Sequence, residues 1–129
     1  MKGTSKIKLN GNETTKKISL SKVTNQDIYP VIRIKDNNGD FEVENETLGD
    51  KRMKLTGLSA YDEVVIDCKN CIITGDGRAL SFTEVGWTNV SDIVWLRFCQ
   101  GVNNLDIKGN GTVTIVYEVP YKKVGGWFE

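Results

Sequence analysis

The last third of the chain carries the strongest structural signal, which is three successive strand patterns separated by turn residues. Residues 93–99 are apolar except for Arg97, a pattern typical of a strand buried on both faces, and Arg97 is expected to pair with a carboxylate. Residues 105–108 and 112–119 both alternate apolar and polar side chains. Asn110-Gly111 stands between them and favours the type I′ turn of a β-hairpin. The sequence therefore predicts a central strand and then a hairpin.

Earlier strand patterns predict that the whole chain is all-β. Residues 31–35 and 64–66 are rich in β-branched side chains, and the turn-rich residues 36–40 predict a second hairpin, in which 31–35 pairs with 41–43. Residues 75–77 (GDG) predict a further turn. No segment of helix length has apolar residues at a spacing of three and four. About ten short strands predict an antiparallel β-sandwich or closed barrel in preference to an α/β fold.

The length of 129 residues predicts a single domain. Residues 1–22 are expected to form an N-terminal extension or peripheral hairpin, because alternating runs at 6–9 and 17–20 flank Asn10-Gly11-Asn12. Residues 23–129 are expected to form the β-sandwich domain.

The charge balance excludes several classes of partner. The chain has 17 basic and 17 acidic side chains, which argues against a nucleic-acid binder that works by counterion release and against a polybasic membrane patch. No apolar run is long enough to span a membrane, and no apolar segment follows the N-terminal residues as in a signal peptide. Synthesis in the cytoplasm is therefore expected.

Catalytic and metal sites find little support in the sequence. Histidine is absent, which excludes Ser-His and Cys-His nucleophiles, and we predict no enzymatic activity. The carboxylates Glu42, Glu44 and Glu46 line one strand face, whereas glycosidase carboxylates converge across a cleft, so a solvated face is the preferred interpretation.

The three cysteines are expected to be reduced thiols, because their number is odd and no secretion signal is evident. Cys68, Cys71 and Cys99 offer at most three zinc ligands, whereas a structural site normally has four. Residues 36–40 carry oxygen ligands, but Phe41 occupies the position where a calcium-binding EF-hand loop needs glycine. We therefore predict no metal and no cofactor.

Four aromatic residues in or beside predicted loops are the candidate contact residues. Exposed aromatic rings in a β-sandwich can stack on sugar rings, but loop aromatics also plug the ends of a sandwich or meet a neighbouring subunit, and the latter roles are preferred. Trp95 is excluded, because its alternation places it in a strand interior. The candidates are Tyr61, Trp87, Tyr121 and Trp127.

From about residue 23 onward, a series of short motifs in a fixed order runs through the chain. The most specific is the turn Gly101-Val102-Asn103, which lies between Trp95-Leu96-Arg97 and Thr112-Val113-Thr114. With Tyr29-Pro30-Val31-Ile32-Arg33-Ile34, Gly39-Asp40-Phe41, Leu55-Thr56-Gly57, Val65-Ile66-Asp67-Cys68 and Pro120-Tyr121, these motifs make the sequence resemble the C-terminal domain of siphophage distal tail proteins, a family of phage tail components.

The resemblance implies a jelly-roll β-sandwich similar to galectins and carbohydrate-binding modules, in a non-enzymatic structural component of a phage or prophage tail tip or baseplate. The implied partners are the tail tube, the tail-associated lysin and the receptor-binding protein. The alternative is a carbohydrate-binding module that helps the particle adhere to host saccharides. The implied location is the virion tail tip, after assembly in the host cytoplasm.

The same resemblance bears on the oligomeric state. Full-length relatives are hexameric, and their ring-forming N-terminal domain has no counterpart before Val23, so we expect this chain alone to be mainly monomeric.

Overall fold

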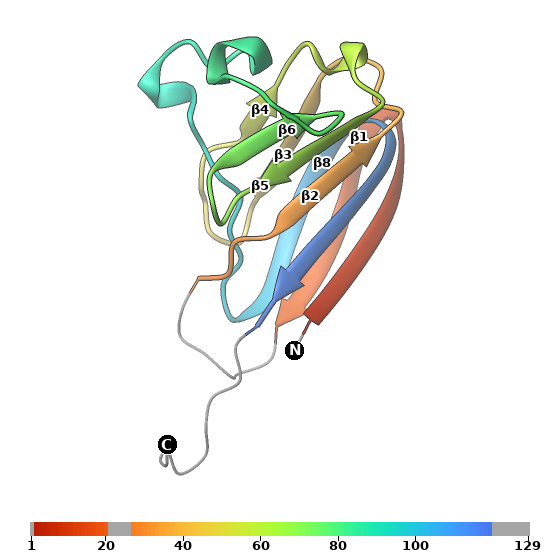
Figure 1. The fold of residues 1–129 in the computed structure, drawn as a ribbon. Helices are drawn as coiled ribbons and strands as arrows, with labels where there is room; N and C mark the ends of the chain where they lie inside the picture. Colours follow the sequence, from red (N-terminus) through yellow and green to blue (C-terminus); the bar gives the residue numbers. More distant parts are fainter. Residues whose placement is uncertain (1, 21–26, 120–129) are drawn as a thin grey trace.

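The computed structural model describes residues 2–20 and 27–119, which form eight β-strands and three short 3₁₀ turns (Figure 1). The 3₁₀ turns are η1 (Leu58–Ala60), η2 (Phe82–Val85) and η3 (Val90–Asp92). No helix among the described residues is long and apolar enough to cross a membrane. The predicted all-β fold class is confirmed.

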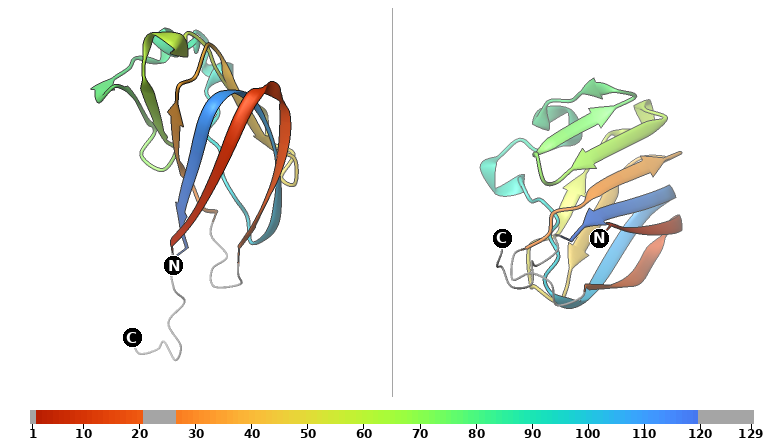
Figure 2. Two further views of the ribbon diagram at one scale, coloured as in Figure 1. Left: turned by 90° about the vertical axis from the view of Figure 1, so that its right-hand side faces the viewer. Right: turned by 60° about the horizontal axis from the view of Figure 1, so that its bottom comes forward.

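Two long bent strands organise the fold. Strand β1 (Lys2–Leu20) pairs antiparallel with β8 (Gly101–Glu118) along its whole length, from Lys2 opposite Glu118 to Leu20 opposite Gly101. Both strands bend over near their midpoints, where Asn10 lies opposite Asn110 and a register shift follows (Figure 2). Each of the two strands therefore runs through both layers of a curled sheet.

The remaining strands extend the two layers from β8. In one layer β3 (Phe41–Asn45) pairs with the first half of β8, and β4 (Met53–Leu55) pairs with β3. In the other layer β2 (Val31–Lys35) pairs with the second half of β8, and the sheet continues through β5 (Glu63–Asp67), β6 (Ile72–Gly75) and β7 (Arg78–Ala79). The result is a sandwich-like antiparallel fold.

The core lies between these layers and consists of the inward side chains of each strand. Alternate residues of β2, β3 and β8 are completely buried, as the period of two requires. This confirms the inward and outward faces predicted for residues 31–35, 105–108 and 112–119, except that Tyr117, predicted to face inward, is only partly buried. The fully buried apolar side chains on these strands are Ile32, Ile34, Phe41, Val43, Leu105, Ile107, Val113 and Ile115.

The hairpin predicted at Asn110-Gly111 is wrong, because the two segments on either side of this turn form one bent strand and do not pair with each other. Gly111 has a φ of 87°, as the turn chemistry suggested, but that conformation serves a corner between layers. The corner passes so close to Lys35 that a Cβ atom on Gly111 would collide with the carbonyl oxygen of Lys35.

Two other hairpin predictions are wrong, because in each case both segments pair with β8 and not with each other. Residues 6–9 and 17–20 belong to one bent strand, β1, which pairs with β8. Strands β2 and β3 flank different halves of β8, so residues 36–40 also connect the two layers. The boundary predicted between residues 22 and 23 lies outside the described residues.

The hairpin at residues 75–77 behaves as its sequence suggests. Strands β6 and β7 pair directly across it, with Gly75 opposite Arg78. The two central residues, Asp76 and Gly77, have φ values of 49° and 84°. Positive φ at both positions is the requirement of a type I′ turn, so the predicted turn is confirmed.

The central strand predicted at residues 93–99 is also wrong. Among the described residues, the segment joins no ladder, and its β-pairing is limited to a bridge in which Ile28 and Phe98 exchange backbone hydrogen bonds of 2.9 and 2.7 Å. Leu96 and Phe98 are buried, whereas Trp95 and Arg97 are only partly buried. The apolar run therefore reflects packing against the core of a segment that belongs to no strand of the sheet.

Candidate functional site

Trp87, one of the four predicted contact residues, is buried in the core. The residue is only 3% exposed, and its indole N–H donates a hydrogen bond of 2.5 Å to the backbone oxygen of Lys54. The ring meets Trp95 edge to face at a centroid distance of 5.1 Å and lies 5.3 Å from Phe82. Trp87 therefore presents no open ring face to a ligand.

Tyr61 is half-buried, and its ring lies over Gly75, where a Cβ atom would come within 2.6 Å of it. Its hydroxyl oxygen accepts a hydrogen bond of 3.3 Å from Arg78, which also pairs with Glu84 at 3.1 Å. The backbone N–H of Ser81 and the Arg78 guanidinium together lower the pKa of Glu84. The structure does not bring Tyr61 and Trp87 together into one site, and Tyr121 and Trp127 lie outside the described residues.

Arg97 pairs with carboxylates, as predicted from its position in an apolar run. Its guanidinium binds both oxygens of Asp50, with Nε at 2.8 Å and Nη2 at 2.9 Å, and Nη1 contacts Asp27 at 2.6 Å. Arg97 thus connects residues 93–99 to the loop after β3 and to the segment before β2. The hydrogen bonds from Arg97 lower the pKa of Asp50.

The Arg97–Asp50 pair predicts a pH-dependent contribution to stability. Since the pKa of Asp50 is lower in the folded state, the contribution is complete above the unfolded value of about 4 and is lost as the pH falls through the folded value. Asp50→Asn is expected to cost about 1 kcal/mol at pH 7, and the difference from wild type should vanish in acid. Urea denaturation across this pH range measures it, with the exposed Asp62→Asn as the matched control. A cost that persists at pH 2 would contradict the assignment.

Arg52 lies at the centre of the second charged cluster. It donates to Glu42 at 2.5 Å, to Glu44 at 2.7 Å and to Asp106 at 3.1 Å. Across the strand pair, a hydrogen bond with Asp106 and the charge of Asp106 raise the pKa of Glu13. Glu42, Glu44 and Asp106 lie on one sheet face and bind a common arginine, so the cluster joins β3, β8 and the residue that precedes β4, and it does not form the two sides of a cleft.

The most deeply buried polar group is Asn103, the last residue of the Gly101-Val102-Asn103 motif. Its Oδ1 accepts hydrogen bonds from the backbone N–H of Cys99 at 2.8 Å and from Nδ2 of Asn45 at 2.9 Å. Its Nδ2 lies within hydrogen-bond distance of the backbone oxygens of Ile18 (3.1 Å), Cys99 (2.9 Å) and Gly101 (3.3 Å). Asn103 therefore links β1, β3, β8 and residues 93–99, and the motif has a structural role.

The cysteines differ in their surroundings. Cys68 is buried, and burial raises the pKa of its thiol to about 12, so it is unreactive at neutral pH. Cys71 is exposed and Cys99 is partly buried, and all three are free thiols.

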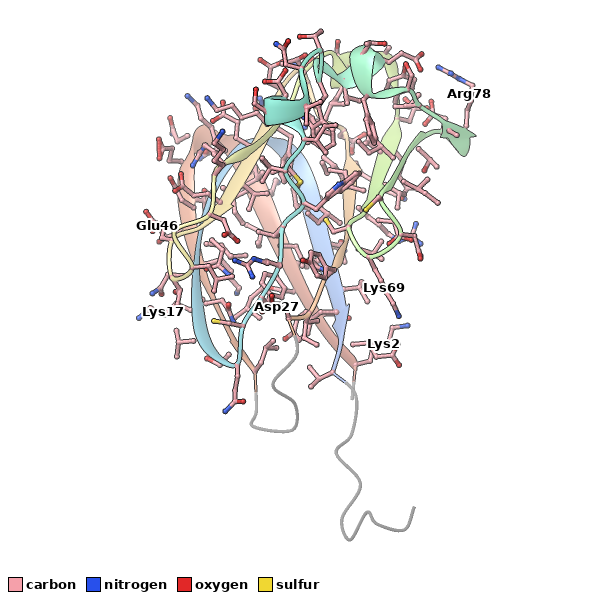
Figure 3. All side chains as sticks on the ribbon, turned by 90° about the vertical axis from the view of Figure 1, so that its left-hand side faces the viewer. Lys2, Lys17, Asp27, Glu46, Lys69 and Arg78 are labelled. Atoms are coloured by element: carbon pink, nitrogen blue, oxygen red, sulfur yellow. The ribbon has the colours of Figure 1, made fainter. Side chains whose placement is uncertain are left out.

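An open groove of about 560 Å³ lies on the outer face of the layer that contains β2, and its exposed aromatic ring is Tyr29. Tyr29 is 40% exposed, and Arg33 and Asp67 also line the groove. Lys2 and Lys69 line it as well and project from the same side of the molecule (Figure 3). The groove therefore offers an aromatic ring among charges of both signs.

Tyr29 was missed among the predicted contact residues, although the sequence carries a signal for it. The alternation that turns Ile32 and Ile34 inward also turns Tyr29, Val31 and Arg33 outward.

Two comparisons with known proteins give a match, and both matches are to phage proteins. A family model described as a phage tail C-terminal domain matches residues 2–117, so the match includes β1. The comparison with curated proteins finds no match.

Among solved structures, the chain resembles the crystal structure of the Dit protein of phage SPP1, described as a paradigm of the hub adsorption apparatus of phages that infect Gram-positive bacteria. The TM-score is 0.60 at 12% identity, and the match covers 91% of this chain and 46% of that one. A likeness at this identity shows a shared fold, and the chain spans less than half the length of the SPP1 protein.

Proposed function

The chain belongs to the phage tail C-terminal domain family, and we propose that it is a non-enzymatic structural component of a tail tip that works by docking onto other tail proteins. The family match over residues 2–117 is the observation that carries this proposal. The proposed partners are the tail tube, the tail-associated lysin and the receptor-binding protein. The proposed location is the virion tail tip, reached after assembly in the host cytoplasm.

The charged clusters support a structural role over a catalytic one. Arg52 and Arg97 each bind carboxylates from different segments of the chain and so connect those segments to one another. Charged residues in an active site instead converge on an accessible space where substrate binds. In both clusters the arginine and the carboxylates form ion pairs with one another.

Immunoelectron microscopy of particles from the phage or prophage that encodes the chain tests the proposed location. Antibodies raised against the purified chain are expected to label the distal end of the tail, and preincubation with the purified chain should abolish the label. Label on the capsid, or along the whole tube, would contradict a role at the tail tip.

A second candidate, binding of host saccharides, is supported by the exposed ring of Tyr29 in the groove. Aromatic rings flanked by polar groups stack on sugar rings in many binding sites. An array of bacterial surface glycans, probed with wild type and Tyr29→Ala, tests it. Saturable binding that the variant loses supports this candidate, and absence of binding by the wild type contradicts it.

A further inference from the structure

Strand β1 leaves an open edge along both layers of the sheet. Its pairing among the described residues is with β8 alone, so the backbone groups that face away from β8 meet no strand (Figure 2). The edge is 19 residues long. The strands at the opposite ends of the two layers, β4 and β7, have only three and two residues. β1 is therefore the longest open edge among the described strands.

The side chains along this edge are strongly basic. Strand β1 contains five lysines and one glutamate, a net charge of +4 in a chain whose total charge is zero. The lysines all have exposed side chains, and Lys2, Lys6 and Lys8 share the outer face of one layer. The lysines are Lys2, Lys6, Lys8, Lys16 and Lys17.

From these observations we infer that the open edge of β1 binds an extended acidic segment of a neighbouring tail protein, which adds a strand to the sheet. The backbone N–H and C=O groups of β1 supply the hydrogen bonds of the new ladder. Carboxylates at alternate positions of the added strand lie beside Lys2, Lys6 and Lys8 on the outer face. The inference deepens the docking role proposed above and rests on it for the source of the partner.

A second copy of this chain is a poorer occupant. Pairing of β1 with β1 of another copy would bring together two edges that each carry a net charge of +4, and like charges on neighbouring strands repel each other. The other open edges, β4 and β7, are too short to cover a strand of this length. The charge and the length of the edge both favour a different, acidic partner.

Edge lysines also protect proteins from unwanted strand pairing, and the experiment must separate that role from selective binding. The probe is a fluorescent peptide of alternating glutamate and valine, and the readout is its anisotropy with the full chain. At about 0.15 M salt, charges more than about 8 Å apart are largely screened. Under that condition Lys6→Glu/Lys8→Glu is expected to weaken binding by about tenfold or more.

The matched control is Lys51→Glu/Lys54→Glu, which makes the same change in net charge at exposed lysines outside β1 and outside the groove that Lys2 lines. It should weaken binding by less than about threefold. Thermal unfolding checks that both variants fold. Equal weakening by the two variants would overturn the inference.

Two further measurements distinguish strand addition from charge attraction. Hydrogen exchange should show new protection of β1 amides when the peptide is bound, while β4 is unchanged. A peptide of the same sequence with every backbone amide methylated keeps its charges but lacks N–H donors, and it should bind about tenfold more weakly or not at all. Equal binding by the methylated peptide, or protection outside β1, would overturn the inference.

Light scattering measures whether the chain in solution is a monomer or a dimer. A monomer is expected, whereas a dimer that depends on β1 would assign the edge to a second copy. If no peptide binds, the edge inference fails even if antibodies label the tail tip. If the tail tip is not labelled, the location proposed above fails whatever the peptide does.

Discussion

Asn103→Ala is expected to lower the free energy of unfolding by about 3 kcal/mol. The side chain is completely buried and joins β1, β3, β8 and residues 93–99 through backbone and side-chain hydrogen bonds. Removing it leaves the N–H of Cys99 and the amide of Asn45 short of partners inside the core. The loss of these bonds is costly because water cannot replace the missing group without opening the structure.

Urea denaturation measures this loss, and the exposed neighbour Asn104→Ala is the control. The control is expected to change stability by less than about 0.5 kcal/mol. An equal effect at both positions would show that the network around Asn103 does not stabilise the fold.

Trp87→Ala is expected to cost about 4 kcal/mol, because it removes a large buried ring and its contacts with Phe82 and Trp95. Trp87→Phe keeps most of the packing but loses the hydrogen bond to Lys54, and it should cost less. A tryptophan that contacts sugar would behave differently, since its loss would remove binding and leave the unfolding midpoint unchanged. The urea midpoints of wild type and both variants decide between these roles.

The sequence predicted the faces of the strands better than their partners. Side-chain alternation is local, so it identified the buried positions in β2 and β8. The Gly75–Gly77 turn was also correct, because the strands on either side of it are neighbours. The turn at Asn110-Gly111 has equally strong local chemistry, yet it makes a corner, because β1 pairs with both halves of β8. A partner some hundred positions away in the chain leaves no sign in a window of ten residues.

The candidate site was only partly predictable for a related reason. The need of Arg97 for a carboxylate followed from its apolar neighbours, but the identities of Asp27 and Asp50 depend on how distant loops pack. Trp87 was a candidate contact residue because it lies in a predicted loop, whereas the fold buries it. The resemblance to phage tail proteins is confirmed by the family match, which also includes β1.

The pairing of β1 with β8 has a consequence for how the protein is made. Lys2 leaves the ribosome long before Glu118, its partner in the ladder, has been synthesised. Neither layer can be completed until synthesis has reached β8, which takes part in both layers. Such non-local pairing makes folding slow. During that interval β1 has neither edge covered, and repulsion between its lysines helps to keep nascent chains on neighbouring ribosomes from pairing with one another.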